Sequence, residues 1–210
     1  MRMAKQIAPR GAGRFGGRRW TFVGALVLAA GSLGAGAGTV GSVPAGRIAG
    51  PADLAPSLSA LRPLVGYAWE VDATWSNGNP LRARNEYRVG LNGNFVTADT
   101  FVSDGAGGEY QRYHSIFARH PSEAGTLQIH GFTYDGSVDI ADMKIIDDGG
   151  AHPLMRVTGE RKMPDGTPVS LRQEMRFTSD TTFTWQVWSV TPDGETQLMD
   201  GVYTRGRKLD

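Results

Sequence analysis

The 210-residue sequence contains no cysteine and only four histidines. Without cysteine the chain has no disulfide, no thiolate metal site, no cysteine nucleophile and no lipid-modified cysteine anchor. The histidines form neither an H-x-H nor an H-E-x-x-H pattern, and a zinc site needs three or four ligands, so we expect no metal. No serine lies in a G-x-S-x-G motif, which leaves a hydrolase triad without support. An enzyme is therefore the less favoured interpretation.

Acidic residues are missing from the first 37 positions, although these carry six arginines and lysines. Since the whole chain has a net charge of +1, the remainder has a net charge of −5. Binding to phosphates needs a concentrated basic surface, which this remainder lacks. We expect no nucleic-acid partner.

The basic start is followed by a short apolar run over 20–30 and then by small residues, with Ala35 and Ala37 in an A-x-A cleavage pattern. This order predicts a secretory signal peptide over 1–37 and a periplasmic or secreted protein. The run is short for a membrane helix, which needs about 20 residues, but an uncleaved anchor stays open. Arg18-Arg19 fits either ordinary basic charge, which we favour, or a twin-arginine export signal. The leader is the only expected contact with a membrane.

Glycine, alanine and proline dominate residues 38–56, which predicts a flexible linker before a domain over 57–210. Leucines 58, 61 and 64 recur at helical spacing, so we expect a short helix that starts near Asp53 or Ser57. Pro63 limits its length.

From Trp69 onwards the pattern changes to period two, which is typical of strands with one apolar face. Residues 69, 71, 73 and 75 share one face of the first strand, and alternation returns in 81–89, 169–177 and 183–189. Gly-containing turn signals separate the strands, and no second long helix intervenes. They lie at 77–78, 92–93, 104–105, 123–125, 135–136, 148–150, 165–166 and 193–194, with a weaker one at 178–180. The sequence predicts an all-β fold, a single antiparallel up-and-down barrel of about nine or ten strands, because closure removes exposed edges.

Several short motifs resemble the lipocalin-like (calycin) β-barrels. Gly66 and Trp69 follow the leucine helix, and Arg205 ends the last strand two residues after Tyr203. This layout is similar to an uncharacterised bacterial lipocalin-like family of unknown function. The similarity also includes Gly93-Asn94-Phe95, the segment 131–136 and the pair Phe183/Trp185. The resemblance implies a barrel with an internal cavity, and Arg205 packed over Trp69 as a structural plug at one end. Two residues separate Gly66 from Trp69, where the lipocalin pattern has one.

A cavity among inward-facing aromatic side chains would suit an apolar or aromatic ligand with a few polar anchors. We expect ligand contacts from eight side chains, namely Trp69, Trp75, Tyr87, Phe101, His130, Phe132, Gln173 and Trp185. The main hypothesis is thus an exported barrel that binds a small hydrophobic molecule in its interior, without a cofactor.

Three alternatives remain open. A barrel enzyme would use an inward Asp99, which shares parity with Phe101, or an inward His130, as general acid or base. A haem-binding barrel would use His130 or His114 as the axial ligand. A structural envelope protein would have a completely filled core.

Overall fold

Ten antiparallel strands make up the computed structural model, which describes residues 53–162 and 168–210, with side chains from 53 to 160 and from 168. The expected leader over 1–37 lies outside these residues. The strands are β1 Tyr67–Trp75, β2 Pro80–Gly90, β3 Phe95–Ser103, β4 Glu109–Arg119, β5 Thr126–Thr133, β6 Val138–Ile146, β7 Leu154–Lys162, β8 Pro168–Ser179, β9 Thr182–Thr191 and β10 Gly194–Lys208. Two 3₁₀ helices, η2 (Pro56–Leu61) and η3 (Leu91–Gly93), accompany them.

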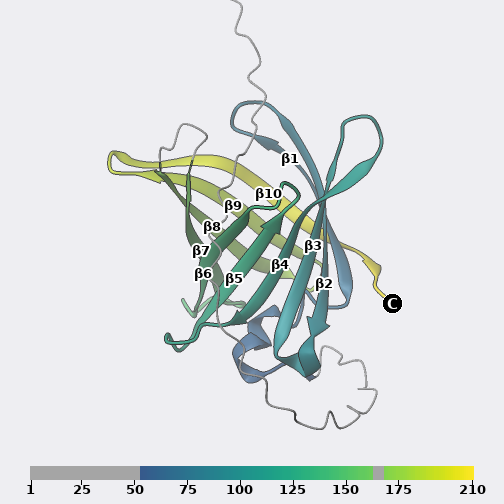
Figure 1. Cartoon of the computed structure of the whole chain (residues 1–210), viewed down its shortest axis with the longest axis vertical. Coiled ribbons are helices and arrows are strands. Elements are labelled where there is room, and N and C mark those ends of the chain that lie inside the picture. The colour runs from purple at the N-terminus through teal and green to yellow at the C-terminus, as the bar shows by residue number, and fades with distance from the viewer. Residues whose placement is uncertain (1–52, 163–167) are drawn as a thin grey trace, which may run out of the picture.

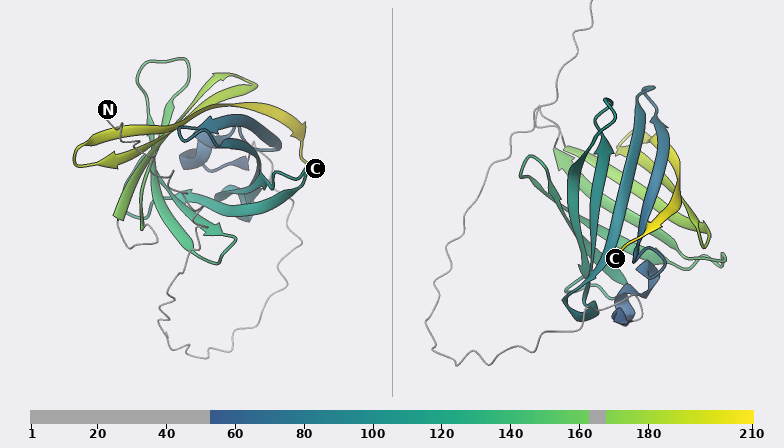
Figure 2. Two further views of the ribbon diagram at one scale, coloured as in Figure 1. Left: turned by 90° about the horizontal axis from the view of Figure 1, so that it is seen from above. Right: turned by 90° about the vertical axis from the view of Figure 1, so that its right-hand side faces the viewer.

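Each strand pairs with its neighbour in sequence, and β1 pairs with β10, so the sheet closes into a barrel (Figures 1 and 2). The closing register places Trp69 opposite Arg205 and Trp75 opposite Met199. The prediction of an all-β, up-and-down barrel is confirmed. Closure gives every strand a hydrogen-bonded neighbour on both sides, which leaves no strand edge exposed.

The predicted turns within the described residues all fall at strand ends. Asn92-Gly93 turns β2 into β3, and Gly93 has a φ of +90°. A Cβ there would lie 1.9 Å from the carbonyl oxygen of Asp53, so only glycine lets the start of the domain pack against this turn. The amide of Ala55 donates to the carbonyl of Gly93 (2.9 Å).

One end of the barrel is closed by η2 and the residues around it, which lie below the strands in Figure 1. Leu58, Leu61 and Leu64 are completely buried there. Trp69 is also fully buried, and its indole Nε1 donates to the carbonyl of Leu64 (3.0 Å). The expected helix is thus a 3₁₀ turn. Leu54, which we placed in the linker, is buried in the core, so the folded domain begins before residue 57.

Alternate residues of each strand point inward, as the pattern predicts for the first, second, eighth and ninth strands. Trp69 and Val71 on β1 face inward beside Tyr87 on β2, and so do Phe177 on β8 and Phe183 on β9. The Phe183 ring stacks on Tyr203 (centroids 4.7 Å apart) and packs at 5.1 Å from Trp69. These rings fill the half of the barrel next to η2.

On the outer face, Glu86 is the centre of an ionic cluster that connects β2 to β10 across β1. Its carboxylate accepts from Arg84, from Arg88 (2.6 Å) and from Arg207 (2.7 Å), and the residue is only 5% exposed. Burial raises the pKa of Glu86, but the hydrogen bond from Arg88 and the charges of all three arginines outweigh it and lower the pKa overall. The cluster therefore supports barrel closure from outside.

Leu61→Ala should lower the free energy of unfolding by about 2–5 kcal/mol, because it opens a cavity in the sealed end. Urea unfolding followed by tryptophan fluorescence measures this. Leu91→Ala is the matched control: Leu91 is 73% exposed, and its loss should cost less than about 0.5 kcal/mol. Equal losses in the two variants would contradict a sealed core at η2.

Glu86→Gln should lower the free energy of unfolding by about 2–3 kcal/mol at pH 7, because three arginines lose their shared carboxylate. A carboxyl with a lowered pKa stabilises the fold above its ordinary value of 4.5 and loses that contribution as the pH falls through the folded-state pKa. The difference between wild type and variant should therefore shrink in acid. Asp72→Asn, which breaks an exposed pair with Arg82, should change stability by at most about 1 kcal/mol. A pH-independent difference would refute the assignment to Glu86.

Candidate functional site

The half of the barrel away from η2 has inward-facing side chains that are only partly buried. Each strand is paired on both sides, so solvent can reach an inward side chain only through one of the two ends of the barrel. One of these ends is covered by η2. The partly buried inward set includes Trp75, Leu81, Asn85, Thr100, Tyr113, Thr133, Leu171, Gln173, Trp185 and Ser189. Within the described residues, the inward side chains that solvent reaches lie in this half, toward the end opposite η2, and they form our candidate site.

Asn85 lies between the sealed core and this open half, with its side chain inward beside Tyr87. Its Nδ2 donates weakly to the Tyr87 hydroxyl (3.5 Å), while its buried Oδ1 accepts no hydrogen bond from the described residues. Turning the amide by 180° would let Oδ1 accept from Tyr87 but would leave Nδ2 unused instead. A buried polar group without a partner costs about 1–3 kcal/mol, so this unused group is a candidate ligand contact.

Tyr87 and Tyr203 form the floor of the site. Burial raises the pKa of Tyr87 to about 12, against a small opposing effect of Asn85. Burial and the neighbouring Tyr87 raise the pKa of Tyr203 still further, so both hydroxyls are neutral at physiological pH. The Tyr203 ring lies 5.6 Å from the ring of Trp185.

Trp185 and Gln173 contribute a further polar pair on β9 and β8. The indole Nε1 of Trp185 donates to Gln173 Oε1 (3.0 Å), which leaves the amide nitrogen of Gln173 directed elsewhere. Of the eight predicted ligand contacts, Trp75, Tyr87, Gln173 and Trp185 share the inward face of the candidate site or its floor. Trp69 also faces inward, but it lies in the sealed core.

The inward placement of Phe101, His130 and Phe132 is wrong, because all three point outward. On β3 the inward residues are small: Val96 pairs with Val89 and Ala98 pairs with Tyr87. Phe101 is instead covered from outside, where the Arg84 guanidinium lies 4.2 Å above its ring, whereas Phe132 is 42% exposed. Trp188 is outward in the same way, 3.8 Å beneath Arg172.

Asp99 is outward as well, so the inward general acid or base of the enzyme alternative is not formed. Its Oδ1 lies 2.7 Å from His114 Nδ1 and accepts from Gln111 (2.8 Å) on the outer surface. His114 and His130, the two candidates for a haem ligand, therefore both lie outside the barrel. Hydrogen bonds on the outer face explain the position of Asp99.

The expected packing of Arg205 over Trp69 is wrong as well. The two residues are paired in register, but the Arg205 guanidinium lies over the ring of Tyr67, 4.6 Å from its centroid. Trp69 is covered instead by Phe177 and Phe183. The plug at this end is thus η2 with its leucines, since these fill the space that Arg205 was expected to cover.

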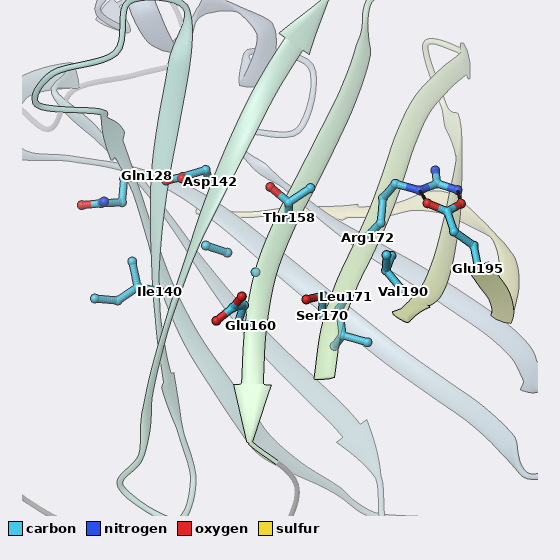
Figure 3. Close-up of a pocket in the computed structure, with 12 residues that line it drawn as sticks. Gln128, Ile140, Asp142, Thr158, Glu160, Ser170, Leu171, Arg172, Val190 and Glu195 are labelled. Carbon is cyan, nitrogen blue, oxygen red and sulfur yellow. Dashed lines mark hydrogen bonds and ion pairs between the residues drawn. The ribbon is translucent and has the colours of Figure 1, made fainter. Parts of the chain in front are cut away.

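A groove of about 630 Å³ crosses the outer face of β5–β10 (Figure 3). Its side chains are mostly outward-facing and hydrophilic, including Gln128, Asp142, Thr158 and Glu160. Arg172 spans part of it by binding Glu195. We place the candidate site inside the barrel rather than here, because none of the residues that line the groove is buried and its Arg172 is already paired with Glu174 and Glu195.

Sequence reasoning missed Asn85, Thr100 and Tyr113, which lie side by side on β2, β3 and β4. The sequence did contain a signal for Asn85: it lies two residues from Tyr87, and therefore on the same inward face of the strand. Tyr113 gave no such signal, because a β-bulge between β3 and β4 changes the phase of β4 just before it.

Among the residues that the structure describes, no three His, Asp or Glu side chains are grouped so that they could hold a metal ion. No helix in the described residues is both long enough and apolar enough to cross a membrane.

Neither a protein-family model nor a curated protein sequence matches the chain. The crystal structure of Rv2717c from M. tuberculosis is similar, with a TM-score of 0.55 and 17% identity, over 74% of this chain and 100% of that one. Two redesigned β-barrels also match: b11L5F_LGL (TM-score 0.34, 13% identity, 70% and 96% covered) and mFAP1 bound to DFHBI (0.33, 14%, 70% and 98%). The similarity to Rv2717c shows a shared barrel fold.

Asn85→Leu should change the free energy of unfolding by less than about 2 kcal/mol, because removal of a buried acceptor without a partner offsets the loss of the weak hydrogen bond to the Tyr87 hydroxyl. Urea unfolding tests this, with Asn85→Ala as a control that creates a cavity and should be destabilising. A loss above about 2 kcal/mol in Asn85→Leu would show that the amide stabilises the fold.

Proposed function

We propose that this protein binds a small, largely apolar molecule inside the open half of its barrel. The observation that carries the proposal is the unused amide group of Asn85, buried beneath an interior that solvent can enter. A core that serves stability alone is fully packed and pairs its polar groups. Ligand pockets instead combine apolar and aromatic walls with a few polar groups that orient the ligand.

The walls of the site support an aromatic or aliphatic ligand. Trp75, Leu81, Leu171 and Trp185 present rings and methyl groups inward, while Gln173 adds a polar anchor. Asp99 and His130, the acid and the base that the enzyme alternative requires, both lie outside the barrel. Binding without chemistry is therefore the function that this geometry supports best.

We also propose a distant relationship to the lipocalin-like barrels. The short helix, Gly66 and a buried Trp69 at the sealed end support it. Ten strands rather than the eight of lipocalins, and Arg205 over Tyr67, separate the chain from the lipocalins proper.

Fluorescence titration with N-phenyl-1-naphthylamine, a neutral apolar probe, tests interior binding. Wild type should bind one probe per barrel. Thr100→Trp should weaken binding about tenfold or more, because Thr100 faces inward between Asn85 and Tyr113 and a ring there fills the site. Thr97→Trp on the outer face of the same strand should change the dissociation constant less than about twofold.

Circular dichroism should show that both variants keep the barrel. The proposal is overturned if wild type shows no saturable binding, or if the inward and outward substitutions weaken binding equally, since the probe would then sit on the outer surface.

A further inference from the structure

Arg112 on β4 has two tyrosine hydroxyls and two tyrosine rings as its side-chain partners among the described residues. Its Nε donates to the Tyr113 hydroxyl (3.1 Å) and its Nη1 to the Tyr110 hydroxyl (3.1 Å). The rings of Tyr113 and Tyr134 lie 5.4 and 5.3 Å from the guanidinium carbon. We call Arg112 with Tyr110, Tyr113 and Tyr134 the tyrosine cage.

Seven other arginines of the described wall are neutralised by acids, whereas Arg205 lies over Tyr67 without an ion pair. Carboxylates pair with Arg82, Arg84, Arg88, Arg156, Arg172, Arg176 and Arg207. No carboxylate of the described residues forms an ion pair with half-buried Arg112. A guanidinium has five N–H donors, and Nη2 of Arg112 donates to no group in the described part of the chain.

The nearby carboxylates are already engaged. Asp104 accepts from the amides of Ala106 (2.8 Å) and Gly108 (2.9 Å) in its own turn. Asp135 accepts from the amide of Ser137 (3.0 Å), and inward-facing Asp139 has a partner of its own. Within the described part of the chain no carboxylate is thus left for the cage, and its positive charge can pair with a group from outside the protein.

The cage lies at the mouth of the candidate site. Tyr113 pairs with Thr100, which pairs with Asn85, and all three face inward. Arg112 is the extra residue of the β-bulge between Gln111 and Tyr113, so it lies closer to the open end than Tyr113 does. The Arg112 carbonyl accepts from the amide of Tyr134, which starts the turn after β5 at the open end. The guanidinium thus lies near the end of the barrel through which a ligand of the candidate site would enter.

We propose that the tyrosine cage binds an oxyanion, so that the ligand of the interior is an amphipathic organic anion: an apolar body with a carboxylate, sulfonate or phosphate ester at one end. This inference rests on the proposed function and specifies its ligand class. Two hydroxyls and two rings hold the guanidinium in place before the ligand arrives, which lowers the entropic cost of binding. The free N–H groups match the oxygens of an oxyanion.

The test compares two probes of nearly the same shape, neutral N-phenyl-1-naphthylamine and 8-anilino-1-naphthalenesulfonate, which adds a sulfonate. Wild type should bind the sulfonate more tightly. Arg112→Gln should weaken sulfonate binding about tenfold or more and change binding of the neutral probe less than about twofold. Arg205→Gln is the matched control: it removes a half-buried arginine over a tyrosine at the sealed end, and should affect neither probe.

Arg112→Lys replaces Arg112→Gln in this test if the glutamine variant does not fold. Lysine keeps the positive charge but lacks the planar guanidinium with its several donors. It should retain part of the sulfonate preference. The inference is wrong if wild type binds both probes equally well, or if Arg112→Gln weakens the binding of both probes alike. In either case the proposal that the interior binds an apolar molecule would still stand. Failure of wild type to bind either probe overturns the proposed function itself.

Inorganic sulfate, compared with chloride at equal ionic strength, separates an amphipathic ligand from a free oxyanion. Sulfate at millimolar concentration should displace the sulfonate probe no better than chloride does. Displacement of that probe by sulfate, with the neutral probe undisturbed, would assign the cage to a free inorganic anion and overturn the amphipathic class.

Discussion

The pairing of β1 with β10 is the constraint on which the rest of the structure depends. It joins residues more than a hundred positions apart, such as Trp69 and Arg205, and gives the sheet an inside and an outside. Glu86 reinforces the closure by binding Arg207 across β1. An open sheet of these strands would expose two edges and one apolar face to water, so closure, core and interior form together.

The closed wall divides aromatic residues between two environments. Inside, Trp69, Phe183 and Tyr203 pack against one another near η2, where space is limited and water is excluded. Outside, arginine side chains cover Phe101 and Trp188, because a guanidinium packs on a ring while its edge stays hydrated. A large ring on this sheet is therefore no sign of an inward position.

The two ends of the barrel are unequal, and this asymmetry connects the fold with the proposed function. The leucines of η2 seal one end and concentrate the stabilising apolar contacts there. The other half keeps inward side chains accessible, leaves one end of the Asn85 amide without a partner, and has the cation of Arg112 at its mouth. Groups that cost stability and lie along one route into the interior are typical of a binding site.

The sequence alone determined the fold class, an approximate strand number of nine or ten and the turns of the described residues, because period-two alternation and Gly-containing turns act between residues close in the chain. It also determined the inward face of strands whose faces differ sharply in polarity, such as Val169–Phe177. Only the tertiary structure decided the faces of Asp99, Phe101, His130 and Phe132, since their strands carry apolar residues on both sides. The β-bulge before Tyr113 and the partners of Arg112 and Arg205 likewise depend on cross-strand register, which is set by contacts between distant segments and by how much volume the closed interior can hold.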